Sequence, residues 1–384
     1  MRNIYLDNNA TTQPAPEVIE AMMPFLRDFW GNPSSMHYFG GQVKKHIEKA
    51  RQQVAALINA DPSEIIFTSC GTESDNTAIR GSVEALARNT VIITSRVEHP
   101  AVLGPCRYMK EQGHNEIEIG VDTTGRLNIH EFRNALTLGP SVASIMWANN
   151  ETGVIFPIQE LAEMVKEAGG IFHTDAVQVV GKIPIDVKKV PVDMLSLSGH
   201  KLHAPKGIGA LYIRKGTKLN TFMIGGHQEN NRRGGTENVP YIVALGRACE
   251  LASGKTSDEM TRISGLRDRL EEGILKTCPD TTVNGDRKER IPNTTNISFQ
   301  YIEGESILYH LSDFGIAASS GSACTSGSLE PSHVIRAMGV PFTAAHGSTR
   351  FSLSRYTADE DIDYVLEKMP GIVTKLRALS PFVR

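Results

Sequence analysis

Four polar segments follow short apolar runs of the chain, at positions 69–74, 97–100, 173–178 and 196–201. If the apolar runs are strands of an open parallel sheet, the segments lie at the carboxyl ends of those strands, where such sheets place their functional groups. They contain a lysine, an aspartate, histidines and a Gly-Thr pair. These residue types suit a chemistry that needs an amine nucleophile, a buried carboxylate and an anion site.

Lys201 and Asp175 are the two residues on which such a chemistry would depend. A lysine that is partly removed from water can lose its proton and form a Schiff base. An ionised carboxylate that follows a buried strand needs a cationic partner, and a protonated pyridine nitrogen is one. The ordinary alternatives, a solvated loop lysine and an aspartate that caps the next helix, remain open from the residues alone.

Gly71 and Thr72 stand between an apolar run and a helical stretch, so that backbone N–H groups and the threonine hydroxyl could hold a phosphate at a helix N-terminus. Ser198 and His200 could add contacts from a neighbouring strand end. The same Gly-Thr turn also fits an ordinary helix cap. The sequence therefore allows either a phosphate site or an ordinary helix cap at this turn.

His99 and Arg350 complete the candidates for binding and proton transfer. His99 precedes Pro100, a rigid turn that would hold the imidazole at the sheet edge to stack on a ring or to move a proton. Arg350 lies in a run of alternating polar and apolar residues that predicts a half-buried strand, and its guanidinium would suit an amino-acid carboxylate. A structural histidine and a surface ion pair are the alternatives.

Cys324 lies in a stretch of small residues, 317–328, that predicts a mobile loop carrying a thiol. The thiol would need a nearby cation or dipole to ionise, and an inert loop cysteine is the alternative. The chain has five cysteines, an odd number, and no Cys-x-x-Cys pair, which argues against a disulfide framework and a zinc site. No His-Glu-x-x-His motif is present, and we expect no metal site.

Composition and charge indicate a soluble, globular chain of two lobes with a small-molecule partner. The 384 residues are 40% hydrophobic, and the formal net charge of -3 gives neither a basic stripe for nucleic acid nor a polybasic segment for a membrane. The N-terminus has no signal-peptide pattern, and no apolar run is long enough to span a bilayer. We therefore expect a cytoplasmic protein.

The elements that must position these residues alternate between strands and helices up to about residue 215, which is typical of a mostly parallel sheet. The expected strands are 64–69, 91–95, 143–147, 171–175 and 193–198. Residues 158–170 predict a crossover helix that ends on a glycine pair.

From about residue 256 the pattern changes to longer charged helices around further strands, which predicts a separate α+β lobe. The expected helices are Ile263–Leu275 and Asp359–Leu376, with strands near 294–299 and 349–353. Pro370 is expected to break or kink the second helix.

The chain resembles a known family, the class I cysteine desulfurases of the NifS/IscS group. These belong to the fold-type I, aminotransferase class V enzymes, which use pyridoxal 5'-phosphate. The resemblance runs nearly end to end and is closest to the nitrogen-fixation NifS type. It rests on motifs that begin at Tyr5, Thr68, Glu98, Asn149, His173, Ser198, Arg233 and Ser319. The fold that it implies is α/β, with a mostly parallel seven-stranded sheet in a large domain and a smaller α+β domain.

The resemblance also implies the domain limits and the roles of individual residues. An N-terminal arm, 1–14, would join the small domain and the active site, 15–255 would bind the cofactor, and 256–384 would carry the mobile cysteine loop, about 317–330. The implied catalytic residues are Cys324, Lys201 and His99. The implied cofactor contacts are Lys201, Asp175, Gln178, His99, Gly71, Thr72, Ser198, His200, Asn150 and Thr236, and the substrate contacts are Arg350, Asn150, Asn8, Ala10 and Thr11.

In the reaction that the resemblance implies, L-cysteine gives L-alanine and its sulfur passes to Cys324 as a persulfide. A homodimer would bring Thr236 of each subunit to the other subunit's phosphate site. The implied sulfur acceptor is an iron-sulfur scaffold protein of the NifU or IscU type, with Cys324 a candidate transient cluster ligand, for nitrogenase or for general iron-sulfur supply. The alternatives are a pyridoxal-phosphate aminotransferase, a cysteine or selenocysteine lyase, and a non-enzymatic sulfur-relay docking protein.

Overall fold

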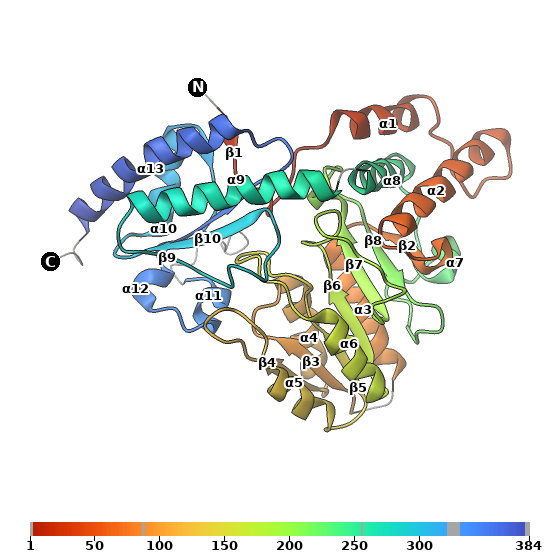
Figure 1. The fold of residues 1–384 in the computed structure, drawn as a ribbon. Coiled ribbons are helices and arrows are strands. Elements are labelled where there is room, and N and C mark those ends of the chain that lie inside the picture. Colours follow the sequence, from red (N-terminus) through yellow and green to blue (C-terminus); the bar gives the residue numbers. More distant parts are fainter. Residues whose placement is uncertain (1–2, 87–88, 255, 321–330, 381–384) are drawn as a thin grey trace.

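The structure is a computed structural model that describes residues 3–86, 89–254, 256–320 and 331–380 (Figure 1). Cys324 and most of the small-residue stretch around it lie outside the described residues.

The larger sheet has seven strands among the described residues, in the order β2-β8-β7-β6-β5-β3-β4. β8 runs antiparallel to its neighbours β2 and β7, and the remaining pairs are parallel. The predicted α/β fold with a mostly parallel seven-stranded sheet is therefore confirmed. The strands are β2 (Ile65–Thr68), β3 (Val91–Ser95), β4 (Asn115–Ile119), β5 (Ser141–Ser144), β6 (Ile171–Asp175), β7 (Met194–Ser198) and β8 (Gly209–Ile213).

Helices connect these strands as the alternating pattern predicts. They are α3 (Gly71–Ala85), α4 (Pro100–Glu111), α5 (Ile129–Leu136) and α6 (Ile158–Glu167). The crossover helix α6 buries Ile158, Leu161 and Val165 on one face. It ends before Gly169, which takes a positive φ of 71° that a residue with a side chain rarely adopts.

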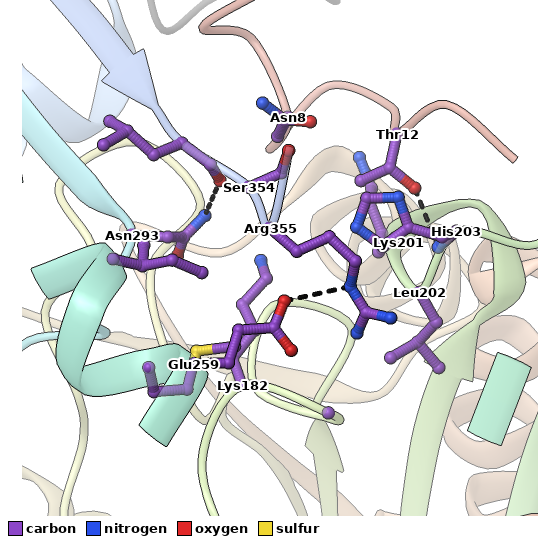
Figure 2. A pocket seen from close by; sticks show the side chains of 14 residues that line it. Asn8, Thr12, Lys182, Lys201, Leu202, His203, Glu259, Asn293, Ser354 and Arg355 are labelled. Carbon is purple, nitrogen blue, oxygen red and sulfur yellow. Dashed lines mark hydrogen bonds and ion pairs between the residues drawn. The ribbon is translucent and has the colours of Figure 1, made fainter. Parts of the chain in front are cut away.

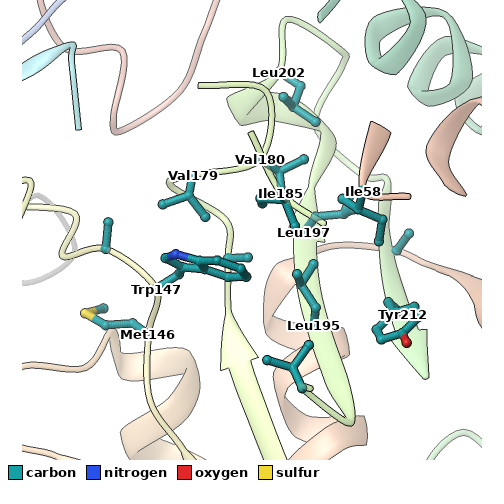
Figure 3. Packing of buried hydrophobic residues seen from close by; sticks show 14 of the residues in the cluster. Ile58, Met146, Trp147, Val179, Val180, Ile185, Leu195, Leu197, Leu202 and Tyr212 are labelled. Atoms are coloured by element: carbon teal, nitrogen blue, oxygen red, sulfur yellow. The ribbon is translucent and has the colours of Figure 1, made fainter. Parts of the chain in front are cut away.

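The apolar run after β5 is the main departure from the expected strands. β5 ends at Ser144 instead of continuing to Trp147, yet Ile145, Met146 and Trp147 are all buried. Figure 3 shows Met146 and Trp147 packed in the same cluster as Leu195 and Leu197 of β7. The run is apolar because the core covers it, and periodicity cannot separate that cause from pairing in a sheet.

Three further helices lie beside the large sheet, α1 (Pro16–Arg27), α2 (Tyr38–Leu57) and α8 (Val239–Ser253). α8 packs against both α1 and α2, and the three form the upper right of the molecule in Figure 1. The short helical segments are η1 (Pro62–Glu64), η2 (Gly199–Lys201) and α7 (Gln228–Asn231). η2 directly follows β7 and carries Lys201.

A second, antiparallel sheet has the order β12-β10-β9 and its own hydrophobic core. Its strands are β9 (Thr281–Val283), β10 (Thr294–Phe299) and β12 (Ser348–Ser352), and its helices are α9 (Thr256–Thr277), α10 (Gly304–Asp313), α11 (His333–Ala337), α12 (Phe342–Ala345) and α13 (Asp359–Leu379). The N-terminal strand β1 (Ile4–Tyr5) pairs in parallel with β11 (Ile316–Ala317). The start of the chain thus lies with the C-terminal part of the molecule, beside α9 and α13 in Figure 1.

Pro370 does not break α13, which continues to Leu379. Its neighbours Met369, Ile372 and Val373 are buried in the core of the antiparallel sheet. This packing offsets the hydrogen bond that proline cannot donate. Among the described residues, no helix is both long and apolar enough to cross a membrane.

Candidate active site

A cavity of about 410 Å³ lies at the carboxyl ends of β6 and β7 and the N-terminus of α3. It brings together most of the residues that the sequence singled out. Its lining includes Ala10, Gly71, Thr72, His99, Asn150, Asp175, Gln178, Ser198, His200, Lys201 and Arg350. Residues that are up to 340 positions apart in the chain therefore share one site.

Lys201 is held by the N-terminal arm. Its Nζ donates hydrogen bonds to the carbonyl oxygens of Asn9, at 2.5 Å, and Ala10, at 2.7 Å. The lysine is partly buried, at the end of a strand whose own residues are all buried. The solvated loop lysine that the sequence left open is thereby excluded.

Asp175 ends β6 and is 7% exposed. One of its oxygens accepts a hydrogen bond from the Val177 N–H at 2.9 Å. Burial raises the pKa of the Asp175 carboxyl to about 6, although that hydrogen bond and the charge of Lys201 act in the opposite direction. A cationic ring nitrogen beside Asp175 would favour its ionised form further.

The two histidines of the site are neutral at physiological pH. Burial, and then the charge of Lys201, lower the pKa of His99 and of His200 to about 4 in each case. His99 caps α4, because its Nδ1 accepts the N–H of Ala101 at 3.1 Å. A neutral imidazole can lie against an aromatic ring without adding a charge to it.

The N-terminus of α3 fits a phosphate group. Cys70 precedes this 15-residue helix without a side-chain cap, so its first N–H groups have no capping side chain. The Ser198 hydroxyl is buried and has no hydrogen-bond partner in the described part of the chain. Because a Cβ at Gly71 would lie 3.0 Å from the Val177 side chain, glycine keeps this corner open. The orphaned hydroxyl is an observation that a bound anion would explain.

Arg350 lies on β12 and is 2% exposed. Its Nη2 contacts Asp7 Oδ1 at 2.6 Å and its Nη1 donates to the Asn150 carbonyl at 3.0 Å. Its Nε is buried without a partner among the described residues. The Nε donor of the guanidinium therefore remains for a carboxylate in the cavity.

Asn9 of the arm also contacts the site, although it is not among the predicted site residues. Its carbonyl accepts Lys201 and also Gln178 Nε2, at 3.1 Å. Asn8 instead donates to the Ser352 carbonyl at 2.8 Å and is absent from the lining of this cavity, and Thr11 reaches it only through His200, at 3.2 Å. The motif that begins at Tyr5 contained Asn9, but nothing in it ranked the two asparagines.

Two buried carboxyl groups near Asp175 were also missed, Asp75 and Glu98. Burial, and then the charge of Asp175, raise the pKa of Asp75. Burial raises the pKa of Glu98 to about 8. Glu98 lies within one polar segment that the sequence identified, and Asp75 directly follows another. A buried carboxyl of raised pKa is typical of a functional site.

Thr236 lies apart from Lys201. It lines a different cavity, of about 160 Å³, together with Ser69 and Arg233. Arg233 Nε is paired with Glu73 Oε1 at 2.8 Å, which ties the Thr236 segment to the first turn of α3. Within one chain, the structure does not bring Thr236 into the Lys201 cavity.

The chain matches the sequence pattern of the aminotransferase class-V family over residues 4–365. It is 58% identical over 382 residues to a protein of Nostoc sp. (strain PCC 7120 / SAG 25.82 / UTEX 2576) named cysteine desulfurase, covering 100% of this chain and 96% of the relative. It is 55% identical over 383 residues to cysteine desulfurase NifS of Azotobacter vinelandii, covering 100% and 95%.

Solved structures show the same fold. A NifS-like protein superposes with a TM-score of 0.91 at 38% identity and covers 98% of this chain and 100% of its own. A NifS-like protein from Rickettsia africae ESF-5 gives a TM-score of 0.88 at 31% identity, with 97% and 100% covered. The chain therefore belongs to the cysteine desulfurases of the aminotransferase class-V family, enzymes that use pyridoxal phosphate.

Proposed function

We propose that the protein converts L-cysteine to L-alanine on pyridoxal phosphate bound through Lys201, and that the sulfur leaves on Cys324 as a persulfide. The observation that carries the proposal is the cavity itself, which places Lys201, Asp175 and Arg350 around one space. An amine, a carboxylate for a ring nitrogen and a guanidinium for a substrate carboxylate are the three groups that such a reaction needs.

The cofactor's phosphate would be held by the N-terminus of α3 at Gly71 and Thr72, with hydroxyl and imidazole contacts from Ser198 and His200. Asp175 would face the pyridine nitrogen, and Gln178 the phenolic oxygen. When bound, pyridoxal phosphate supplies an electron sink for the electron pair that remains on Cα when the substrate loses its proton.

Lys201 and His99 are the groups that would move protons at the substrate's Cα and Cβ. A lysine amine can take up a proton only when it is neutral, and its partial burial favours that form. His99 is already neutral, so it can accept a proton without first losing one. Arg350 and Asn150 would fix the substrate carboxylate and so orient the Cα proton.

Cys324 would accept the sulfur by direct attack of its thiolate on the thiol sulfur of the substrate. An S–S bond forms, the C–S bond breaks, and the carbon takes the electron pair and then a proton to give alanine. We also propose that 317–330 carries Cys324 between the cavity and the surface, and that an iron-sulfur scaffold protein of the NifU or IscU type receives the sulfur.

We further propose a cytoplasmic homodimer in which the partner's Thr236 completes the phosphate site. Support comes from large apolar side chains that are exposed between α1 and the start of α2: Trp30, Met36, Tyr38 and Phe39, with exposed fractions of 51% to 103%. An apolar patch of this kind is typical of an interface. The proposed units are the arm 1–14, a cofactor domain 15–255 and a small domain 256–384, and sedimentation would test the dimer.

The test is to incubate the cofactor-loaded protein without oxygen with L-cysteine and a reductant, and to quantify alanine, sulfide and pyruvate. We expect equal amounts of alanine and sulfide, and neither product from Cys324→Ser. Cys70→Ser is the matched control, because Cys70 lines the cavity and should be dispensable. Pyruvate, or alanine that survives Cys324→Ser, would point to a lyase or an aminotransferase.

A further inference from the structure

Lys182 is a buried lysine that the proposed reaction does not use. It is 9% exposed and lies four positions after Gln178, beyond the end of β6. Its Nζ donates to Gln178 Oε1 at 3.0 Å and to Asn9 Oδ1 at 3.4 Å. A buried ammonium is costly unless its position serves a purpose, so these two contacts need an explanation.

The lysine ammonium determines which way the Gln178 carboxamide points. When protonated, Lys182 has three donors and no acceptor, so Gln178 turns its oxygen toward Lys182 and its NH₂ group away. That NH₂ group then donates to the Asn9 carbonyl at 3.1 Å. Without a neighbour that can only donate, a carboxamide can adopt either of its two orientations.

The orientation of the Asn9 carboxamide is set in the same way. Its Oδ1 faces Lys182 and also Asn293 Nδ2, which donates to it at 3.0 Å. Its Nδ2 therefore points to the Thr294 hydroxyl, at 2.8 Å. The Asn9 carbonyl accepts from Gln178 and from Lys201 at the same time, so Lys182 is linked to Lys201 through one residue.

Lys182 and Lys201 also line one small cavity, of about 30 Å³ (Figure 2). The other charged or titratable groups that line it are His203 and the ion pair of Glu259 with Arg355, at 3.0 Å. Burial, and then the charges of Lys201 and Arg350, lower the pKa of Lys182 to about 7. By the same repulsion, a charge on Lys182 disfavours a proton on Lys201.

We propose that Lys182 is a positioning residue of the cofactor site, which turns the NH₂ group of Gln178 toward the cofactor oxygen and keeps the Asn9 carbonyl against Lys201. Its charge also favours the neutral amine of Lys201. This inference rests on the roles proposed above for Gln178 and Lys201. On this proposal, Lys182 acts on the binding and protonation of the cofactor and not on the stability of the hydrophobic core.

The experiment is a double-mutant cycle of Lys182→Met and Gln178→Ala in the full-length protein. It measures the apparent dissociation constant of pyridoxal phosphate, the pH midpoint of the bound cofactor's absorbance change and the melting temperature. Each single variant should weaken cofactor binding about 10-fold, because each loses one hydrogen bond involving a charged group or its oriented partner. The double variant should fall clearly short of the 100-fold product of the two single effects, since Lys182 acts in part through Gln178.

The pH midpoint separates the effect of charge from that of orientation. Lys182→Met should raise it by about one pH unit, because a nearby positive charge is lost. Lys182→Gln retains a donor for Gln178 without the charge, so it should recover part of the binding while keeping the shifted midpoint. Lys188→Met, on an exposed lysine of the same segment, is the matched control and should change neither quantity.

Independent effects that multiply to about 100-fold in the double variant would overturn the proposal. So would a Lys182→Met protein whose melting temperature falls while its cofactor affinity and pH midpoint stay at the wild-type values. The proposed function fails separately, if the wild-type protein binds the cofactor but makes no alanine, or if Lys201→Ala keeps the wild-type absorbance.

Discussion

The cofactor side and the substrate side of the cavity are built in different ways. The cofactor side takes its groups from successive strand ends between Gly71 and Lys201. On the substrate side, Arg350 of β12 contacts Asp7 of the arm, 343 positions away in the chain. The first therefore depends mainly on the large sheet, with the arm adding two contacts to Lys201, whereas the second depends on the pairing of β1 in the arm with β11.

Their electrostatics differ as well. On the cofactor side, burial moves the pKa of Asp175, Glu98 and His99 toward the neutral form of each group. On the substrate side, the buried guanidinium of Arg350 is paired with the carboxylate of Asp7. A bound cofactor therefore completes the charge balance of one side, while the other side already has a paired guanidinium and retains its Nε donor for substrate. Changes on the two sides should accordingly have different kinetic effects.

Lys201→Ala would break the cofactor side most severely. Alanine formation should fall by at least about 10³-fold, because the variant loses both the covalent attachment and a proton carrier. Initial rates with L-cysteine and the absorbance of the bound cofactor are the measurements. Lys188→Ala is the control, and a Lys201→Ala enzyme with a tenth of the wild-type rate would contradict the assignment.

Asp175→Asn tests the electronic part of the same side. The amide cannot neutralise a protonated ring nitrogen, so kcat should fall about 10²-fold with little change in KM. Steady-state kinetics at a fixed saturating cofactor concentration would show it. A rise in KM at constant kcat would mean that Asp175 acts on substrate binding and would remove the distinction between the two sides.

Arg350→Met tests the substrate side. KM for L-cysteine should rise by about 10²-fold, because a charge-assisted contact to the carboxylate is lost, while cofactor affinity stays unchanged. Asp7→Asn keeps the guanidinium but loosens it and should raise KM by only about 5-fold. Cofactor loss from either variant would show that the two sides are not independent.

A separate expected effect is on stability and concerns Glu98. Because burial raises its pKa from the usual 4.5 to about 8, the folded state retains a proton that the unfolded state releases. Its contribution to stability is complete below pH 4.5 and is lost as the pH rises to about 8, at about 1.4 kcal/mol per pH unit. Urea unfolding between pH 5 and 9 should show this slope in the wild type relative to Glu98→Gln. Parallel curves for the two proteins would refute it.

The sequence by itself determined the cofactor side, for a local reason. A strand is apolar because it is buried, and a polar residue at its end is conspicuous against that run. Lys201, Asp175, His99 and Ser198 stand at or just after such ends, and the structure brings all four to one cavity. The element types could be inferred in the same way.

Only the tertiary structure decided the contacts that bridge distant segments. The pairing of Asp7 with Arg350, the carbonyl of Asn9 on Lys201 and the ammonium of Lys182 on Gln178 join the arm, the sheet and β12. Burial outside the sheet at 145–147 and the continuation of α13 past Pro370 were likewise set by packing. The periodicity of a sequence indicates whether a residue is buried, but it does not indicate which residues it contacts. It also does not indicate whether the oxygen or the nitrogen of a carboxamide faces a given neighbour.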